Sequence, residues 1–314
     1  MREILKFINH ASFIVETSNS ILLVDPWVEG YVFDNGWSLL DKSTSNKELC
    51  RYLKKQSKSL FIWYSHEHPD HFSVSFIKEL KRQKLNAKFF FQRTLDKRLT
   101  SFLRKNNFEI IESNFVKESI EEKFNLITFP HEDGDSFLLI LVNGKSILNL
   151  NDCVIDTKKK SWKLNKQLSK YCSKIDIMMT QFGYANWIGN PDQIMLRRNA
   201  SDEKISRIKL QNKIINPKTI IPFASFVSFC HKENFYMNDV QNTPFKIYKS
   251  NLSHEFRDKM IIMKPWDEID LKNLELNSIK LLKFQNNAIP GATAYDIFDI
   301  IKTIFREWED CENA

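Results

Sequence analysis

The densest group of side chains that could do chemistry lies in the stretch SHEHPDH, residues 65–71. Three histidines and two acids fall within six positions, directly after the apolar run LFIWY. Imidazole and carboxylate groups are ligands for zinc, iron and manganese, so the pattern H-x-H-x-D-H predicts a metal site. The alternative, histidines satisfied by hydrogen bonds in the core, suits one histidine better than three beside two acids.

The spacing within this stretch separates it into two half-sites. His66 and His68 are two residues apart, so on an extended segment they project to the same side and can bind one metal ion. Asp70 and His71 fall in the turn that leads into a helix and can reach a second ion, while Pro69 stiffens that turn. The end of a buried strand is also the position favoured for sites in α/β folds.

Further ligands are expected at the ends of other strands. His131 follows the apolar run LITFP, and Asp152 follows SILNLN. Each could be an ordinary turn residue, but their order after H-x-H-x-D-H favours metal binding. Asp25, at the end of ILLV, either accepts a hydrogen bond from a ligating imidazole or is a turn acid before Pro26.

The elements that must position these side chains alternate between strands and helices. Strands are expected over residues 12–17, 21–26, 60–65 and 87–92, and helices over 47–55, 73–84 and 95–106. The middle of the chain is β-rich, with Asn143-Gly144 as a two-residue hairpin turn. The pattern is that of an α/β layer protein.

The alternation continues after residue 152, with a polar helix over 201–215, a strand over 279–284 and an amphipathic helix over 294–309. No low-complexity linker marks a boundary. We therefore expect a single domain over residues 1–314, made of two similar halves that meet near residues 150–160.

Composition narrows the class of protein. The net charge of +7 comes from basic residues scattered along the 314-residue chain, which argues against a nucleic-acid partner and is compatible with an anionic substrate. The five cysteines form no C-x-x-C pair, so no disulfide framework or cysteine-built metal site is indicated. No signal segment or membrane span is visible, so a cytoplasmic location without a membrane partner is expected.

SHEHPDH, His131 and Asp152, in this order, resemble the successive metal-binding motifs of the metallo-β-lactamase fold superfamily. The early segment HASFIVETSNSILLVDPW resembles its opening hairpin. This resemblance implies a four-layer αββα sandwich of two mixed β-sheets with the metals at one edge.

A narrower resemblance rests on ILLVDPWVEGYVFDNGWSLL, HPDHFS, ILNLNDC, DIMMTQFG, IIPFASF and IPGAT. These segments are similar to the non-Rieske part of cytidine monophosphate-N-acetylneuraminic acid hydroxylases. The resemblance implies an amino-sugar, sialic-acid-like or nucleotide-sugar substrate. A Rieske centre needs C-x-H and C-x-x-H pairs, and because the sequence contains neither, no Rieske domain is expected.

The last ligand departs from the superfamily pattern. Most members place a histidine directly after the late strand, where this chain has Pro222-Phe223-Ala224. The resemblance to the hydroxylases indicates His231 as the replacement. The alternative is that His231 is a simple loop histidine.

Such a site would hold two divalent ions, zinc or iron, with manganese also possible. Bridged by Asp152 and a water, they would activate that water, and Asp70 would orient it, so a hydrolase is predicted. If the ions are iron, the same ligands suit an oxygenase that takes electrons from a separate protein. A third hypothesis for the function is a non-catalytic binding protein.

Weaker candidates surround this centre. Trp27, Tyr31 and Trp37 could stack on a sugar or base, although aromatic residues after a strand are often core. His10 could face the site from the first hairpin, with a hydrogen-bonding role at a strand end as the alternative. His254 is expected to be a surface residue.

Overall fold

Two large mixed β-sheets form the centre of the protein in our computed structural model, which describes residues 2–249 and 259–277. The first sheet has, in spatial order, β17 (Glu275–Asn277), β16 (Glu268–Asp270), β1 (Ile4–Asn9), β2 (Ser12–Glu16), β3 (Ser20–Val24), β6 (Ser59–Trp63), β7 (Lys88–Phe91) and β8 (Glu109–Glu112). Its strands β3, β6, β7 and β8 are parallel, and the others are antiparallel.

The second sheet has, in spatial order, β14 (Thr219–Phe223), β13 (Ile177–Gln181), β12 (Lys145–Asn149), β11 (Ser136–Val142), β10 (Phe124–Pro130) and β9 (Lys117–Glu121). Strands β12, β13 and β14 are parallel, and β9 to β12 are antiparallel. The β11–β12 turn is the predicted hairpin, with positive φ angles at Asn143 and Gly144.

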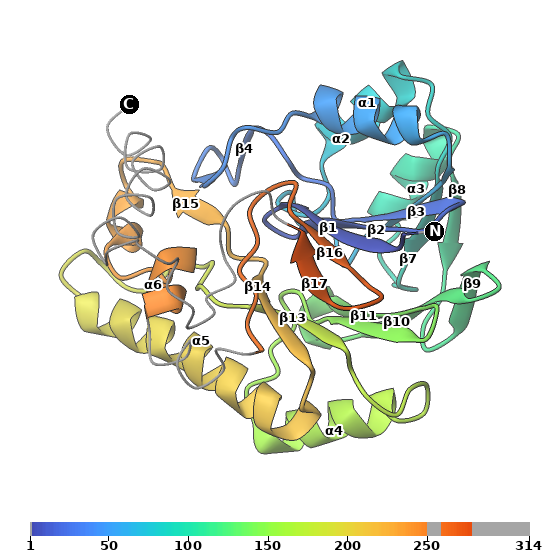
Figure 1. The fold of residues 1–314 in the computed structure, drawn as a ribbon. Coiled ribbons are helices and arrows are strands. Elements are labelled where there is room, and N and C mark those ends of the chain that lie inside the picture. The colour runs from blue at the N-terminus through green and yellow to red at the C-terminus, as the bar shows by residue number, and fades with distance from the viewer. Residues whose placement is uncertain (1, 250–258, 278–314) are drawn as a thin grey trace, which may run out of the picture.

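Helices cover the outer face of each sheet (Figure 1). The first sheet is covered by α1 (Asn46–Gln56), α2 (Val74–Arg82) and α3 (Arg98–Lys105), and the second by α4 (Lys158–Leu168) and α5 (Ile194–Ile215). A short helix α6 (Pro244–Lys249) and two 3₁₀ turns, η1 (Glu132–Gly134) and η2 (Phe235–Asn238), complete the helical elements of the described chain. The predicted αββα sandwich of two mixed sheets is confirmed.

Aromatic side chains hold the two sheets together. Phe7 and Phe13 of the first sheet pack edge-on against Phe223 of the second, with ring centroids 6.2 and 5.5 Å apart. All three are fully buried. Burial of one such side chain is worth about 2–3 kcal/mol, so this contact fixes how the loops at the nearby strand ends face one another.

A third, three-stranded sheet was not anticipated. It consists of β15 (Val227–Phe229), β5 (Trp37–Leu39) and β4 (Tyr31–Val32). Strands of two or three residues are too short to show a period in the sequence, which explains why they were missed. Helix α5 also begins seven residues before the expected start.

The chain crosses from the first sheet to the second between β8 and β9, so residues 150–160 follow β12 within the second sheet. The expected strand over 279–284, the helix over 294–309, the IPGAT motif and His254 lie outside the described residues. Within the described part, no helix has the length and apolar character that a membrane span requires.

The carboxyl ends of parallel strands from both sheets meet at one edge of the sandwich. There the Asn151 side chain, after β12, donates to Asp25, after β3, and the amide of Ala224, after β14, donates to the carbonyl of His10, after β1. Loops that leave these strand ends can bring side chains from distant parts of the sequence together.

Candidate metal centre

Hydrogen bonds anchor the H-x-H-x-D-H loop at the end of β6. The Ser65 amide donates to Asp25 Oδ1 (2.8 Å), and the Ser136 hydroxyl donates to the Ser65 carbonyl (2.6 Å). The amide of His71 donates to the carbonyl of His68 (3.0 Å), which closes the turn. Ser73 then caps helix α2, so the backbone of this loop is fixed at both ends.

His66 and His68 face one another as the sequence spacing predicts. The Nε2 atom of His66 lies 3.0 Å from Nδ1 of His68. Two atoms that bind one ion at about 2.0–2.2 Å, with angles between octahedral and tetrahedral values, lie about 2.8–3.6 Å apart. With Asp70, these two histidines form one group of potential ligands whose atoms all lie within 4.8 Å of one another.

His71 joins two further groups of this kind. One contains His66, His71 and Asp152, and the other contains His10, Asp70 and His71. His71 Nε2 lies 3.4 Å from Asp70 Oδ2 and 3.5 Å from Asp152 Oδ2. His71 is therefore a common member of both groups, and its Nε2 atom faces two carboxylates at spacings suited to shared metal binding.

Asp25 holds the other side of the His71 ring. Its Oδ2 atom lies 3.1 Å from His71 Nδ1 and accepts a hydrogen bond from the Asn151 side chain (2.8 Å). Asp25 is fully buried, with a φ angle of 39° that non-glycine residues rarely adopt. A proton held on Nδ1 by Asp25 leaves Nε2 free to bind a metal, which is one of the two roles that the sequence left open for this acid.

Burial and the charges of neighbouring side chains shift the pKa values of these groups. Burial, followed by the nearby charge of His71, lowers the pKa of His66 to about 3, so its ring is neutral at physiological pH. Burial alone would raise the pKa of Asp70 and of Asp152, but the neighbouring histidines, with His71 contributing most, together outweigh it and lower both pKa values. Burial opposes protonation of His71, yet Asp70 and Asp152 raise its pKa well above the ordinary value.

Several buried polar atoms at this edge have no hydrogen-bond partner. They are both ring nitrogens of His10, Oδ1 of Asp70, Nε2 of His71 and Nε2 of His131. A buried polar atom left unpaired costs roughly 1–3 kcal/mol, so several together call for a ligand that pairs with them. Bound metal ions would do so, and the residues present fit such ions.

The two outer histidines predicted from the sequence differ in their surroundings. His131, directly after β10, is half-buried with its unpaired Nε2, but it belongs to none of the three groups. The side chain of His231, after β15, is 43% exposed, lies 4.0 Å from Glu233 and also belongs to none of them.

The predicted aromatic residues are divided between core and surface. Trp27 and Trp37 are buried and belong to one apolar cluster with Val227 of the third sheet, whereas Tyr31 is 57% exposed. Phe33, which the sequence did not single out, is exposed and lies edge-on to the His68 ring at 6.3 Å. It is therefore an exposed aromatic ring placed directly beside a candidate ligand.

Comparison with known proteins now identifies the fold. No family model matches the chain. Over 86% of its length the chain superposes on a possible metal-dependent hydrolase from Veillonella parvula (TM-score 0.58, 12% identity, 100% of that chain). It also superposes, over 85% of its length, on the metallo-β-lactamase fold protein YhfI from Bacillus subtilis (TM-score 0.53, 10% identity, 98% of that chain).

The protein has a metallo-β-lactamase fold. A third structure similar to it is a mutant of the β-hydroxylase CmlA (TM-score 0.55, 14% identity, 86% of this chain and 54% of that one). A possible metal-dependent hydrolase and a β-hydroxylase thus both resemble this chain in fold, and the likeness alone does not choose between their activities.

Sequence similarity points to one group of enzymes. The chain is 23% identical to cytidine monophosphate-N-acetylneuraminic acid hydroxylase of Xenopus laevis over 252 residues, and 24% identical to that of Sus scrofa over 256 residues. These matches cover 74% and 75% of this chain but only 40% and 55% of the relatives. The chain thus spans about half the length of the curated relatives it matches.

We call the edge of the sandwich where these potential ligands gather the metal edge. Residues that the sequence did not reveal contact the potential ligands there. Asp135 lies 3.7 Å from His66 Nδ1, and burial, with the charge of Asp152, raises its pKa to about 7. Gln181 donates to Asp152 Oδ1 (3.2 Å) and accepts from Lys204 of α5. Neither the second Asp of HEDGDS nor a Lys in a polar helix carries a distinguishing signal in the sequence.

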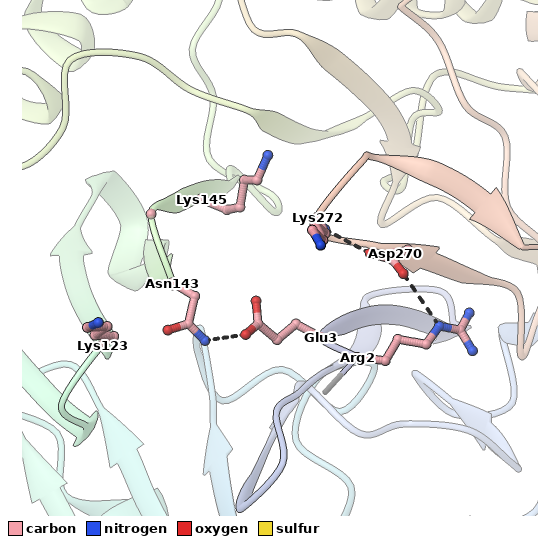
Figure 2. Close-up of a pocket in the computed structure, with 8 residues that line it drawn as sticks. Arg2, Glu3, Lys123, Asn143, Lys145, Asp270 and Lys272 are labelled. Carbon is pink, nitrogen blue, oxygen red and sulfur yellow. Dashed lines mark hydrogen bonds and ion pairs between the residues drawn. The ribbon is translucent and has the colours of Figure 1, made fainter.

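A hollow lies at the end of the sheets where β1 begins, opposite the metal edge (Figure 2). Its volume is about 670 Å³, and it is lined by Arg2, Glu3, Lys123, Asn143, Gly144, Lys145, Asp270 and Lys272. It begins where β1 starts, roughly 20 Å along that strand from His10. Glu3 and Asp270 are engaged with Asn143 and Arg2, so the hollow shares no group with the metal edge.

Proposed function

We propose that this protein is a dinuclear metal-dependent hydrolase. The observation that carries the proposal is the convergence of buried imidazole and carboxylate atoms that lack hydrogen-bond partners at one edge of a metallo-β-lactamase fold. In this proposal His66 and His68 hold one ion, Asp70 and His71 hold the second, and Asp152 lies between them. His131 is proposed as a further ligand of the first ion.

A pair of divalent ions supplies the activation of a water molecule near neutral pH. The chain's own residues prepare the site for it. Asp70 and Asp152 are anionic, because contacts with the neighbouring histidines outweigh burial and lower their pKa values. Asp70 also has an unpaired Oδ1 that can accept a hydrogen bond from that water and so orient it. Asp25 keeps the His71 ring in the orientation that directs Nε2 into the site.

We further propose an amino-sugar, sialic-acid-like or nucleotide-sugar substrate. The names of the sequence relatives support this class. Lys204 supports an anionic group on the substrate, because its ammonium donates to Gln181, which donates to Asp152, and so places a positive charge close to the site. Exposed Phe33 and Tyr31 could stack on a sugar or base at the entrance.

A second candidate is a non-haem iron oxygenase that oxidises an amino sugar with electrons from a separate protein. The specific observation in its favour is that the similar region of the relatives belongs to hydroxylases, together with the fold shared with a β-hydroxylase. Imidazole and carboxylate ligands suit iron as well as zinc. A non-catalytic binding protein is the remaining alternative.

Metal analysis separates the two enzymatic candidates. The protein is purified without oxygen, its metal content is measured, and it is screened with nucleotide-activated and free amino sugars. Zinc or manganese with oxygen-independent bond cleavage is the result expected for the hydrolase. About two irons with substrate-dependent oxygen consumption would overturn it in favour of the oxygenase.

A pair of variants within one loop provides the control. His68→Ala should abolish activity and lower the metal content. Glu67→Ala, one residue away, should do neither, because Glu67 pairs with Arg98 at the surface. Full metal content and full activity in His68→Ala would favour the binding-protein alternative.

A further inference from the structure

His10 is a buried histidine without a hydrogen bond at either ring nitrogen. It lies in the turn between β1 and β2 and is 1% exposed. Its ring stands edge-on to Trp27 and to His71, each with centroids 5.6 Å apart. An ordinary core histidine would donate one N–H and accept at the other nitrogen, so the environment of His10 does not satisfy it.

The unpaired nitrogen faces two of the proposed ligands. His10 Nε2 lies 3.5 Å from Asp70 Oδ2, which is itself 3.4 Å from His71 Nε2. His71 Nε2 is in turn 3.5 Å from Asp152 Oδ2. These three separations fall within the range of about 2.8–3.6 Å between atoms that bind one ion. His10, Asp70 and His71, whose ligand atoms all lie within 4.8 Å of one another, could therefore bind one metal, and Asp152 lies next to His71.

The backbone places His10 beside the strand end where the superfamily histidine is missing. The amide of Ala224, the first residue after β14, donates to the carbonyl of His10 (3.1 Å). Both residues have positive φ angles, 38° for His10 and 50° for Ala224. Ala224 has no side chain that could bind a metal, but its neighbour in space brings an imidazole to this position.

We infer that His10 supplies the last imidazole ligand of the second ion, in the place that His231 was expected to take. This inference rests on the proposed dinuclear site, because it completes the half-site of Asp70 and His71. The ligand comes from the first hairpin of the chain instead of from the loop after a late strand. His231, exposed and beside Glu233, is then a loop histidine.

Metal binding tests the inference without any knowledge of the substrate. The full chain is stripped with a chelator and reloaded with Zn²⁺ or Co²⁺, and bound metal is counted by mass spectrometry and titrated by calorimetry. His10→Ala should retain one ion per chain and lose the second. His231→Ala is the matched control and should retain both. The affinity for the second ion should fall by more than the roughly 10–100-fold that loss of an outer partner costs.

The outcomes distinguish a failure of the His10 inference from a failure of the proposed dinuclear function. Two ions in His10→Ala, with one in His231→Ala, would overturn the inference and leave the dinuclear site intact. No bound metal in the unmodified protein would overturn the proposed function itself. If His10→Ala does not fold, as judged by circular dichroism, His10→Gln keeps much of the side-chain volume and is expected to lose the same ion. Two tightly bound ions in His10→Gln would also overturn the inference.

Discussion

Two buried aspartates at opposite ends of the sheet sandwich have very different partners. Asp176, just before β13, accepts hydrogen bonds from the Ser146 amide and hydroxyl (3.0 and 3.2 Å) and pairs with Lys218 (3.0 Å). Asp70, at the metal edge, has an unpaired Oδ1 and lies 3.4 Å or more from its histidine neighbours.

The difference indicates that the two ends of the sheet sandwich have different roles. The end with Asp176 satisfies its buried charge with the protein's own groups, which stabilises the fold. The end with Asp70 leaves donors and acceptors unpaired, which is unfavourable without a ligand and is typical of functional sites. Changes at the two ends should therefore have effects of different kinds.

The largest effect is expected from Asp70→Asn. The amide cannot serve as an anionic ligand or accept a proton, so we expect one ion to be lost and activity to fall by about 10³-fold, equivalent to several kcal/mol. Metal analysis and rates on a substrate found in the sugar screen provide the measurement. Glu67→Gln is the control in the same loop. Unchanged metal content in Asp70→Asn would contradict the assignment of metal binding to the end with Asp70.

A smaller effect, on the affinity for metal, is expected from Asp25→Asn. The amide has the same shape but a weaker acceptor for the His71 ring, so the affinity for metal should fall roughly 10–100-fold. Competition with a coloured chelator measures this change. A change below about threefold would show that the Asp25 contact does not position His71.

Asp176→Asn should change stability and not metal content. Burial alone would raise the pKa of Asp176, but Lys218 and Ser146 outweigh it and lower the pKa. We expect a loss of about 1–3 kcal/mol of unfolding free energy at pH 7. A lowered folded-state pKa contributes stability above the unfolded value of about 3.9, and that stability disappears as the pH falls through the folded value. Denaturant unfolding at several pH values should therefore show the variant and the unmodified protein converging in acid.

The smallest effect is expected in the hollow of Figure 2. Lys145→Gln and Lys272→Gln remove charges whose ammonium groups have no ion-pair partner within the described residues. Metal content and activity should stay unchanged, and Tm should shift by less than about 2 °C. A clear loss of activity in either variant would show that this end also takes part in function.

Much of the fold and half of the metal edge could be predicted from the sequence. Local signals located the strands expected over 12–17, 21–26, 60–65 and 87–92, the helices over 47–55, 73–84 and 95–106, and the Asn143-Gly144 turn. The short strands of the third sheet carry no such signal. The H-x-H-x-D-H stretch is also local, so its pairing of His66 with His68 followed from spacing alone.

The rest depended on contacts between residues far apart in the chain. Nothing near His10 in the sequence shows that it faces Asp70, because this contact depends on how β1 and β2 pack beside β6. Asp135 and Lys204 are similar cases, since each reaches the site from a segment without a distinctive pattern. The resemblance to the hydroxylases favoured His231, whereas the neighbour of Ala224 in space is His10.

The hydrogen bond between Ala224 and His10 joins residues 214 positions apart. Contacts of such high sequence separation form late in folding, because a long loop must close before they reward the chain. In the folded protein, His10 of the first hairpin contacts both Asp70 and the residue that follows β14. Capture of the second metal ion would then mark completed folding, and a partly folded chain would be recognisable by its single ion.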